Sequence, residues 1–323
     1  MIRKHIYKPT KDILRQASAL LKSGELVSFA TETVYGLGAD ATNSMAVAKI
    51  FALKNRPQFN PLIVHISEPD QAQYYVKIND LAKKLSDAFW PGPFTMVLPL
   101  LENHPLSDLI TAGLNTVAIR VPKNATAHQL LQEFKGPIAA PSANLSGKIS
   151  PTTAEHVADE FGSELKMIID GGACEKGIES TIIQVLDDQV ALLRPGNITV
   201  EDIEKITKTQ VIISADNNEA PLSPGQLKSH YAPETKLILN VIQPKSNQCL
   251  LGFGQIEIDQ DTYLLNLSPS GDLTEAAANL FSMLRTLDQM NFSSIAVSPI
   301  PHTGLGLAIN DRLKRAAASK DEI

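Results

Sequence analysis

Gly136-Pro-Ile-Ala-Ala-Pro141 is an apolar run that continues into the small polar residues Ser142-Ala-Asn-Leu-Ser-Gly147 and then Ser150-Pro-Thr-Thr-Ala-Glu-His156. The apolar run predicts a short buried strand, and the Ser/Thr-Pro start predicts that a helix opens behind it. Backbone N–H groups at a helix N-terminus favour phosphate or carboxylate, and Ser142 and Asn144 would add neutral donors. An ordinary capped turn explains this stretch equally well, so its meaning depends on the segments around it.

Strands and helices alternate on both sides of this stretch. Apolar residues recur at helical spacing in residues 11–23, 44–53, 79–89, 125–134 and 152–161. Apolar runs that predict strands lie at 26–29, 62–66, 95–100, 116–121, 138–140, 167–169, 180–185 and 191–194. Such alternation predicts an α/β domain with a twisted sheet, parallel in part and antiparallel where the connections are short.

A change of composition divides the chain. Residues 214–226 are polar and rich in turn formers, which is typical of a linker. Strand candidates at 236–239, 250–253, 262–266 and 294–298, with helix candidates at 272–288 and 305–318, predict a second, smaller α/β unit. We therefore expect a first domain over residues 1–212, a linker over 213–235 and a second domain over 236–323.

Composition excludes several classes of protein. A chain of 323 residues is long for one hydrophobic core, and 43% hydrophobic with 20% charged residues is ordinary for a globular protein. The net charge of -6 argues against bulk nucleic-acid binding and limits any RNA contact to a local basic patch. Cys174 and Cys249 belong to no CxxC or His/Cys cluster, so neither a disulfide framework nor a metal site is expected. Without an apolar leader or about 18 consecutive apolar residues, we expect a cytoplasmic protein that does not span a membrane.

Two segments of the first domain combine special backbone residues with charge. Ala30-Thr-Glu-Thr-Val-Tyr-Gly-Leu-Gly38 follows a strand, and its ordinary interpretation is a β-turn in which glycine supplies positive φ. Lys54-Asn-Arg56-Pro57 ends a helix, where basic residues commonly complement the helix dipole. The chain then returns to the sheet through Asn60-Pro-Leu-Ile-Val-His65, which leaves both cations on a short, proline-stiffened loop. That placement suits a polyphosphate.

Basic residues within apolar strands also point to an anionic ligand. His65 and Arg120 lie inside strand candidates, and Arg194 ends another. A buried cation needs a partner, which is either a protein carboxylate or a ligand. A satisfied core residue is the commoner explanation for each one alone, but none of the three has an acidic neighbour in the sequence. Gly177-Ile-Glu-Ser-Thr181 adds flexible backbone beside hydroxyl donors, although a hairpin loop would look the same.

Common nucleotide and hydrolase motifs are absent from the sequence. It has no Gx4GK[ST] loop and no GxGxxG after the first strand, which argues against a P-loop NTPase and a dinucleotide-binding fold. It has neither a GxSxG elbow nor an HExxH helix. A nucleotide, if one binds, occupies another kind of pocket.

In order along the chain, these segments resemble the YrdC/Sua5 family of threonylcarbamoyl-AMP synthases. The resemblance spans about residues 10–210 and is carried by Thr31-Glu-Thr-Val-Tyr-Gly-Leu-Gly-Ala-Asp40, Lys54-Asn-Arg56-Pro57, Asn60-Pro-Leu-Ile-Val-His65, Trp90-Pro-Gly-Pro93, Thr116-Val-Ala-Ile-Arg-Val-Pro122, Ala140-Pro-Ser-Ala-Asn-Leu-Ser-Gly147, Ser150-Pro-Thr152, Gly177-Ile-Glu-Ser-Thr181 and Leu193-Arg-Pro-Gly196. Residues 224–233 and 304–313 are similar to the linker and to a late motif of the longer, Sua5-type members. Ala30, Asn55 and Lys148 depart from the family pattern at peripheral positions, which puts loop stiffness in question.

The resemblance implies a YrdC-like twisted mixed sheet with flanking helices and a smaller, Rossmann-like α/β Sua5 domain. It implies a nucleotidyltransferase that condenses L-threonine, bicarbonate or CO2, and ATP into threonylcarbamoyl-AMP and diphosphate, for the t6A base at tRNA position 37. Mg²⁺ would accompany ATP and bridge its phosphates largely through water. A tRNA threonylcarbamoyl transferase would receive the product.

Site residues follow from the same resemblance. Lys54 and Arg56 would hold the triphosphate and act in catalysis. The remaining ATP contacts would come from Ser142, Asn144, Ser150, Arg194, His230 and Tyr231. The threonine contacts would come from Thr33, Tyr35, His65, Arg120 and Ser180, with Arg120 facing the carboxylate. No residue is expected to ligate a metal directly.

Two questions stay open on the sequence alone. His230 and Tyr231 lie in a Pro- and Gly-bounded segment that we expect to close over the pocket as a lid, yet a passive surface linker is an equally good interpretation. Two other classes of protein also remain. One is an RNA-binding module, against which the acidic total counts, and the other is a carbamoyl-transfer domain like that of hydrogenase-maturation proteins, whose acylphosphatase and zinc-finger signatures are missing here.

Overall fold

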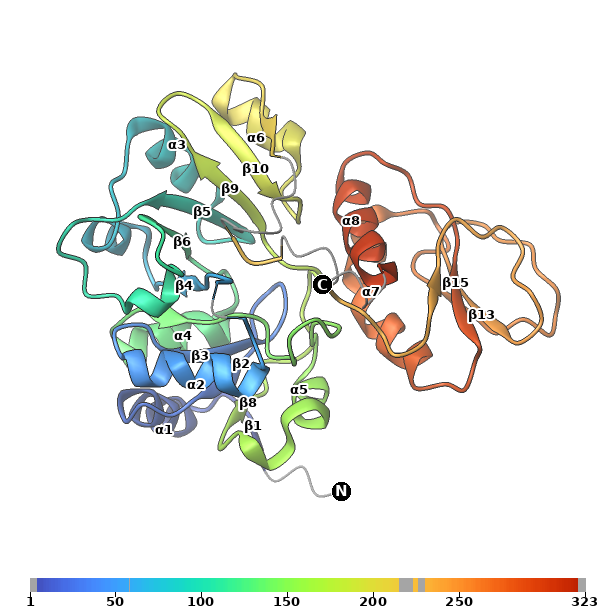
Figure 1. Ribbon diagram of the computed structural model, residues 1–323, viewed down its shortest axis with the longest axis horizontal. Coiled ribbons are helices and arrows are strands. Elements are labelled where there is room, and N and C mark those ends of the chain that lie inside the picture. Colours follow the sequence, from blue (N-terminus) through green and yellow to red (C-terminus); the bar gives the residue numbers. More distant parts are fainter. Residues whose placement is uncertain (1–4, 58, 215–222, 226–229, 319–323) are drawn as a thin grey trace.

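The computed structural model describes residues 5–57, 59–214, 223–225 and 230–318, which form two α/β units (Figure 1). In the first unit, eleven strands of the described chain form one mixed sheet in the order β1-β8-β2-β3-β7-β4-β6-β5-β9-β10-β11. The strands are β1 (Ile6–Tyr7), β2 (Val27–Phe29), β3 (Gly36–Asp40), β4 (Ile63–His65), β5 (Phe94–Pro99), β6 (Thr116–Arg120), β7 (Ile138–Ala139), β8 (Ile168–Ile169), β9 (Thr181–Val185), β10 (Val190–Arg194) and β11 (Ile212–Ile213). The mixed, twisted α/β sheet expected from the sequence is confirmed.

The centre of this sheet combines both strand directions. β4 runs parallel to β6 with His65 opposite Arg120, and β6 runs antiparallel to β5 with Arg120 opposite Thr95. β5 is in turn parallel to β9, where Thr95 lies opposite Ile182. These pairings bring polar residues of strands that are distant in sequence to the same part of the sheet.

Helices flank the first sheet and begin where the sequence supplies a polar cap. They are α1 (Lys11–Lys22), α2 (Ser44–Lys54), α3 (Asp80–Phe89), α4 (Ala125–Phe134), α5 (Ala154–Phe161) and α6 (Val200–Thr207), with 3-10 turns η1 (Pro69–Tyr74), η2 (Asp108–Ile110) and η3 (Gly162–Glu164). The Asn43 side chain accepts from the N–H groups of Met45 and Ala46 at the start of α2, and Asn124 does the same for α4. Because these side chains satisfy free N–H groups, each helix start is visible in the sequence.

One local expectation needs correction, and another is confirmed. Residues 30–38 are interpreted as a turn from the sequence, but Gly36–Asp40 forms β3, which pairs with both β2 and β7. Gly38 fits there because a Cβ would come within 2.8 Å of the Phe29 ring. The helix expected over residues 152–161 is confirmed, because α5 begins at Ala154 behind the cap Thr153.

The second unit is a four-stranded parallel sheet in the order β12-β15-β13-β14, as far as the chain is described. Its elements are β12 (Leu237–Ile238), β13 (Gln248–Gly252), β14 (Leu264–Asn266), α7 (Leu273–Asp288), β15 (Ser294–Val297) and α8 (Leu305–Ala317). Figure 1 shows α7 and α8 on the side of this sheet that faces the first unit. Part of the expected linker, residues 215–222 and 226–229, lies outside the described residues.

The two units share a packed interface. Val34, Ile149 and Ile178 of the first unit belong to the same buried cluster as Leu280 and Phe281 of α7. Arg285 of α7 donates to the carbonyl oxygen of Ile149 and lies 3.3 Å from Glu160. The second unit is therefore held against the first by apolar burial and by a partly buried cation.

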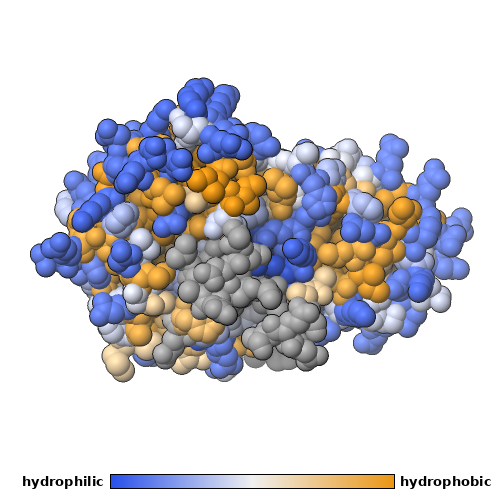
Figure 2. Space-filling model, turned by 45° about the horizontal axis from the view of Figure 1, so that its top comes forward, coloured by the Kyte–Doolittle hydropathy of each residue, from blue (hydrophilic) through white to orange (hydrophobic). Residues whose placement is uncertain are grey.

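The outer surface is mixed. In the face shown in Figure 2, hydrophilic residues lie at the outer edges with hydrophobic residues between them. Among the residues that the structure describes, no helix has the length and hydropathy needed to cross a bilayer.

Gly177 brings its backbone close to α7 of the second unit, and its replacement tests how tightly the units pack. A Cβ at Gly177, where φ is +69°, would lie 2.3 Å from the Ala278 carbonyl oxygen. Gly172 has a similar φ of +86°, but a Cβ there would meet nothing within 4 Å. We expect Gly177→Ala to lower the free energy of unfolding by about 1–3 kcal/mol more than Gly172→Ala. Thermal unfolding of both variants measures this, and equal losses would show that the interface adapts.

Candidate active site

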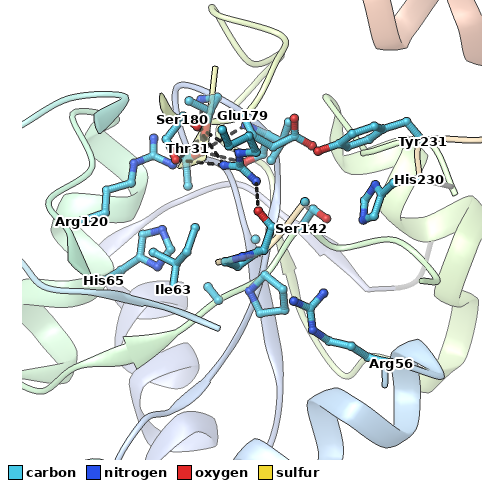
Figure 3. A pocket seen from close by; sticks show the side chains of 18 residues that line it. Thr31, Arg56, Ile63, His65, Arg120, Ser142, Glu179, Ser180, His230 and Tyr231 are labelled. Atoms are coloured by element: carbon cyan, nitrogen blue, oxygen red, sulfur yellow. Dashed lines mark hydrogen bonds between the residues drawn. The ribbon is translucent and has the colours of Figure 1, made fainter. Parts of the chain in front are cut away.

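A polar cavity lies where the central strands of the first sheet meet the described part of the linker (Figure 3). Its walls include three arginines, Arg56, Arg120 and Arg194, and a single carboxylate among the described lining residues, Glu179. Hydroxyl groups of Thr31, Thr33, Ser142 and Ser180 complete the polar lining. This excess of positive charge and of neutral donors suits a small anionic ligand.

Arg56 reaches the cavity because α2 ends sharply. Asn55 adopts the left-handed conformation with φ of 50°, which turns the chain after Lys54. The Arg56 guanidinium donates to the Asn60 carbonyl oxygen at 3.1 Å and side-chain oxygen at 2.7 Å, and to the Pro61 carbonyl oxygen at 2.8 Å. These contacts are neutral, so the positive charge of Arg56 stays available to a ligand.

Lys54 is placed differently from the sequence expectation. Its ammonium is buried and donates to the carbonyl oxygens of Ser142, at 2.7 Å, and of Asn144. Burial, and then the nearby Arg56 charge, lower the pKa of Lys54. Lys54 thus supports the Ser142–Asn144 loop from behind and is not among the residues that line the cavity.

The Ser142 loop contributes one residue to the wall. Ser142 lines the cavity and forms a β-bridge with Gly36. Asn144 donates to the carbonyl oxygens of Leu145 and Lys148 at 2.8 and 2.9 Å, and no described group pairs with its buried side-chain oxygen. The expected helix N-terminus is absent from the described wall, since α5 starts ten residues after Asn144.

Arg120 already has a protein carboxylate. Its Nη2 lies 2.6 Å from Glu32 Oε1, its Nη1 donates to Thr33 Oγ1 at 2.9 Å, and its Nε donates to the Gly92 carbonyl oxygen. Burial raises the pKa of Glu32, but the charge of Arg120, its hydrogen bond and the backbone hydrogen bonds together outweigh burial, so the pKa is lowered overall. Of the two kinds of partner that the sequence left open for Arg120, the structure shows a protein carboxylate, which lies 88 residues away in sequence.

Arg194 contacts carbonyl and hydroxyl oxygens. It donates to the Ser180 carbonyl oxygen at 2.9 Å and Oγ at 3.2 Å, and to the Pro224 carbonyl oxygen at 3.3 Å. Ser180 Oγ is also 2.8 Å from Thr95 Oγ1. Among the described residues, no carboxylate is within ion-pair distance of Arg194. Its positive charge is therefore available to a ligand, like that of Arg56.

The buried histidines are not cations at neutral pH. Burial lowers the pKa of His65 to about 3 and that of His230 to about 3. The interpretation of His65 as one of three buried cations is therefore wrong. Both rings can instead exchange hydrogen bonds with a ligand, because Nδ1 of each is buried without a partner among the described residues.

Tyr35 and Ser150 lie outside the cavity wall as the structure describes it. The Tyr35 hydroxyl donates to the Gly172 carbonyl oxygen at 2.8 Å, and burial raises its pKa. Ser150 Oγ donates to Glu179 Oε1 at 2.6 Å, so it orients a lining residue. Thr33, His65, Arg120 and Ser180, which are expected to act together, do line one cavity.

His230 and Tyr231 cover the cavity. The Tyr231 ring stacks on Phe281 of α7 at 5.3 Å between centroids, and the His230 ring lies against it at 4.0 Å. Figure 3 shows both side chains at the cavity edge, with Tyr231 on the same side as Glu179. The cavity volume is about 40 Å³, which is room for a few water molecules.

Sequence reasoning missed Glu179 and Arg312. Glu179 lies in Gly177-Ile-Glu-Ser-Thr181, where the hydroxyls and glycine drew attention but the carboxylate did not. Arg312 comes from α8 of the second unit, and its Nε is 3.1 Å from Glu179 Oε2. A lone acid at the start of a buried strand is a signal that could have marked Glu179, whereas the contact with Arg312 requires the tertiary structure.

The fold and the cavity define a two-domain α/β protein in which the first domain and the described part of the linker line a small, positively charged cavity. A family model described as "Telomere recombination", for Sua5, YciO and YrdC proteins, matches residues 19–196, and one described as "Threonylcarbamoyl-AMP synthase, C-terminal domain" matches residues 198–318. The chain belongs to the YrdC/Sua5 family of threonylcarbamoyl-AMP synthases, in its two-domain form.

Individual relatives agree over nearly the whole chain. Threonylcarbamoyl-AMP synthase of Bacillus subtilis (strain 168) is 42% identical, over 95% of this chain and 93% of the relative. That of Pyrococcus abyssi (strain GE5 / Orsay) is 39% identical, over 94% of each. The crystal structure of P. abyssi Sua5 complexed with L-threonine matches with a TM-score of 0.87 at 37% identity, over 97% of this chain and 96% of that chain. The resemblance seen in the sequence motifs is confirmed.

Proposed function

We infer that this protein is an L-threonylcarbamoyladenylate synthase, which condenses L-threonine, bicarbonate or CO2, and ATP into threonylcarbamoyl-AMP and diphosphate. The observation that carries this conclusion is the closed cavity lined by arginines and hydroxyls, in a chain of this family. P. abyssi Sua5, a relative of the same length and fold, holds L-threonine.

The chemistry suits such a cavity. The threonine amine forms a bond to the carbon of CO2 or bicarbonate, with loss of a proton or of water, to give a carbamate. A carbamate oxygen then attacks the α-phosphorus of ATP, and the bond to the bridging oxygen breaks so that diphosphate leaves. We assign the enzyme to the nucleotidyltransferases for this reason. Positioning and stabilisation of negative charge are enough for both steps, and no covalent protein nucleophile is needed.

We propose the following roles for the residues in and around the cavity. Arg56 and Arg194, whose charges are available, would contact the triphosphate together with Ser142. Lys54 and Asn144 would act through the loop at Ser142–Asn144, and Ser150 would act through Glu179, which it orients. Threonine would lie near Thr33, His65, Arg120 and Ser180, and its carboxylate would share Arg120 with Glu32. Tyr35 would act only through the backbone at Gly172.

Mg²⁺ would enter with ATP as part of the substrate. The described residues hold no cluster of three His, Cys, Asp or Glu side chains, and Glu179 already accepts from Ser150 and Arg312. The described residues therefore offer no set of ligands for a resident metal ion, and we propose that the phosphates and water carry the ion. The product would pass to a tRNA threonylcarbamoyl transferase.

Diphosphate release from the purified protein tests the function directly. We expect release only with ATP, Mg²⁺, L-threonine and bicarbonate all present, and at least tenfold less when serine replaces threonine, because one methyl group is worth about 1–3 kcal/mol. Omitting each component in turn is the control. Folded protein that releases no diphosphate and binds RNA in a salt-sensitive manner would favour the RNA-binding alternative.

Arg56 and Lys54 can be separated by measurement. We expect Arg56→Met to weaken ATP binding by at least tenfold, since a charge-assisted hydrogen bond contributes about 1.5–3 kcal/mol. Lys54→Met should lower both the melting temperature and turnover, because it leaves two carbonyl oxygens buried without a donor. Calorimetric titration with ATP and thermal unfolding distinguish the two, and normal ATP affinity in Arg56→Met would mean that the triphosphate site is misplaced.

The linker is proposed to act as a lid. A cavity of about 40 Å³ is too small for ATP, so we expect His230 and Tyr231 to move away when ATP enters. On closing they would keep water from the reactive adenylate. We expect His230→Ala, Tyr231→Ala to bind ATP but to yield less threonylcarbamoyl-AMP per diphosphate released, because water reaches the product. Chromatographic quantification of both products measures the ratio, and an unchanged ratio would remove the lid.

A further inference from the structure

Arg312 belongs to the second domain, yet it reaches the cavity wall of the first. Its side chain is fully buried, with Nε 3.1 Å from Glu179 Oε2 and Nη1 donating to the Pro195 carbonyl oxygen at 2.6 Å. The guanidinium carbon lies 5.5 Å from the centre of the Tyr231 ring. The Arg312 side chain therefore joins α8 to three places: Glu179 just before β9, Pro195 just after β10, and Tyr231 in the linker.

Asp311 fixes Arg312 from the other side. Asp311 Oδ2 accepts from Arg312 Nη1 at 2.9 Å, and Asp311 Oδ1 accepts from Arg315 Nε at 2.9 Å. The order Arg315, Asp311, Arg312, Glu179 thus alternates in charge from the second domain to the cavity. This network restricts the orientation of Asp311 and Arg312, since each of them lies between two opposite charges.

We propose that Arg312 is a positioning residue of the active site, which holds the Glu179 carboxylate and the Tyr231 ring in place and makes the second domain part of the catalytic unit. This inference rests on the proposed function, because it concerns the same cavity. Arg312 itself is not among the lining residues, so it acts through Glu179 and Tyr231.

Glu179 depends on Arg312 for its charge. The groups that face it are Arg312 from α8, Arg194 from β10, the Ser150 hydroxyl, and His230 and Tyr231 from the linker. Burial raises the pKa of Glu179, and the charges of Arg312 and Arg194 outweigh burial so that the pKa is lowered overall. Without Arg312 the pKa rises, and the carboxylate takes up a proton at a higher pH than before. The cavity would then lose its one negative charge among the described lining residues.

Arg285 provides a matched control. It too is a largely buried arginine that joins the second domain to the first, through Ile149 and Glu160. Neither of those partners lines the cavity. If arginines at this interface serve only to hold the domains together, Arg285→Met and Arg312→Met will have the same consequences.

The experiment compares the full-length wild-type protein with Arg312→Met, Arg312→Lys, Arg285→Met, Glu179→Gln and the double variant Arg312→Met, Glu179→Gln. Threonine-dependent diphosphate release is measured between pH 5 and 9, and the affinities for ATP and L-threonine are measured by calorimetry. Thermal unfolding first confirms that each variant is folded. If Arg312→Met does not fold, Arg312→Lys carries the test, because lysine keeps the charge but cannot bond Glu179, Pro195 and Asp311 in the same geometry.

We expect the acid limb of the kcat/KM profile to move to higher pH in Arg312→Met by about 1–3 units, the usual effect of losing an opposite charge at contact. The sign follows from the lowered pKa of Glu179, since the ionised form is lost as pH falls and is lost earlier without Arg312. Arg312→Lys should keep a limb near that of the wild type with at least about threefold weaker ligand binding. Arg285→Met should leave the pH dependence of kcat/KM unchanged.

The double variant distinguishes positioning from general support. With Glu179 replaced, removal of Arg312 should cause less than about twofold further loss, because the two residues act as a unit. Equal effects of Arg312→Met in both backgrounds, or equal profiles for Arg312→Met and Arg285→Met, would overturn the inference. A wild-type protein without threonine-dependent release would overturn the proposed function instead, and the calorimetric affinities of the same variants would still decide the role of Arg312.

Discussion

The burial of charged side chains is the constraint on which the rest of this structure depends. Arg56, Arg120, Arg194 and Arg312 are all buried, together with Glu32 and Glu179. A buried charge without a partner costs several kcal/mol, so each one restricts the segments that can lie beside it. Strand ends, the linker and α8 therefore take positions that give every guanidinium an oxygen to bond.

The arginines differ in the groups that they bond. This difference separates the arginines that support the cavity wall from those that can bind a ligand. Arg120 and Arg312 are paired with carboxylates at 2.6 and 3.1 Å. Arg56 and Arg194 bond carbonyl, amide and hydroxyl oxygens, which orient them without neutralising them. A cavity with both kinds is rigid and still positive. Such preorganised charge is what the attack of a carbamate on a phosphate requires, because it needs no reorganisation during the reaction.

Local signals in the sequence predicted the elements well, and the site only in part. Asn43 and Asn124 mark the starts of α2 and α4, and the apolar runs mark most strands, because caps and periodicity act between near neighbours. β3 was missed, since its Gly36-Leu-Gly38 segment looks like a turn and becomes a strand only between β2 and β7. Lys54 was placed facing the ligand, but the loop at Ser142 and Asn144 takes up its ammonium.

By itself, the sequence determined the α/β class, the two domains and the family, because periodicity, composition and ordered motifs are properties of neighbouring residues. It also brought Thr33, His65, Arg120 and Ser180 forward as one group, and all four line the cavity. Only the tertiary structure decided which charges pair. Glu32 meets Arg120 across 88 residues and Glu179 meets Arg312 across 133, and pairings over such distances depend on how sheets and domains pack.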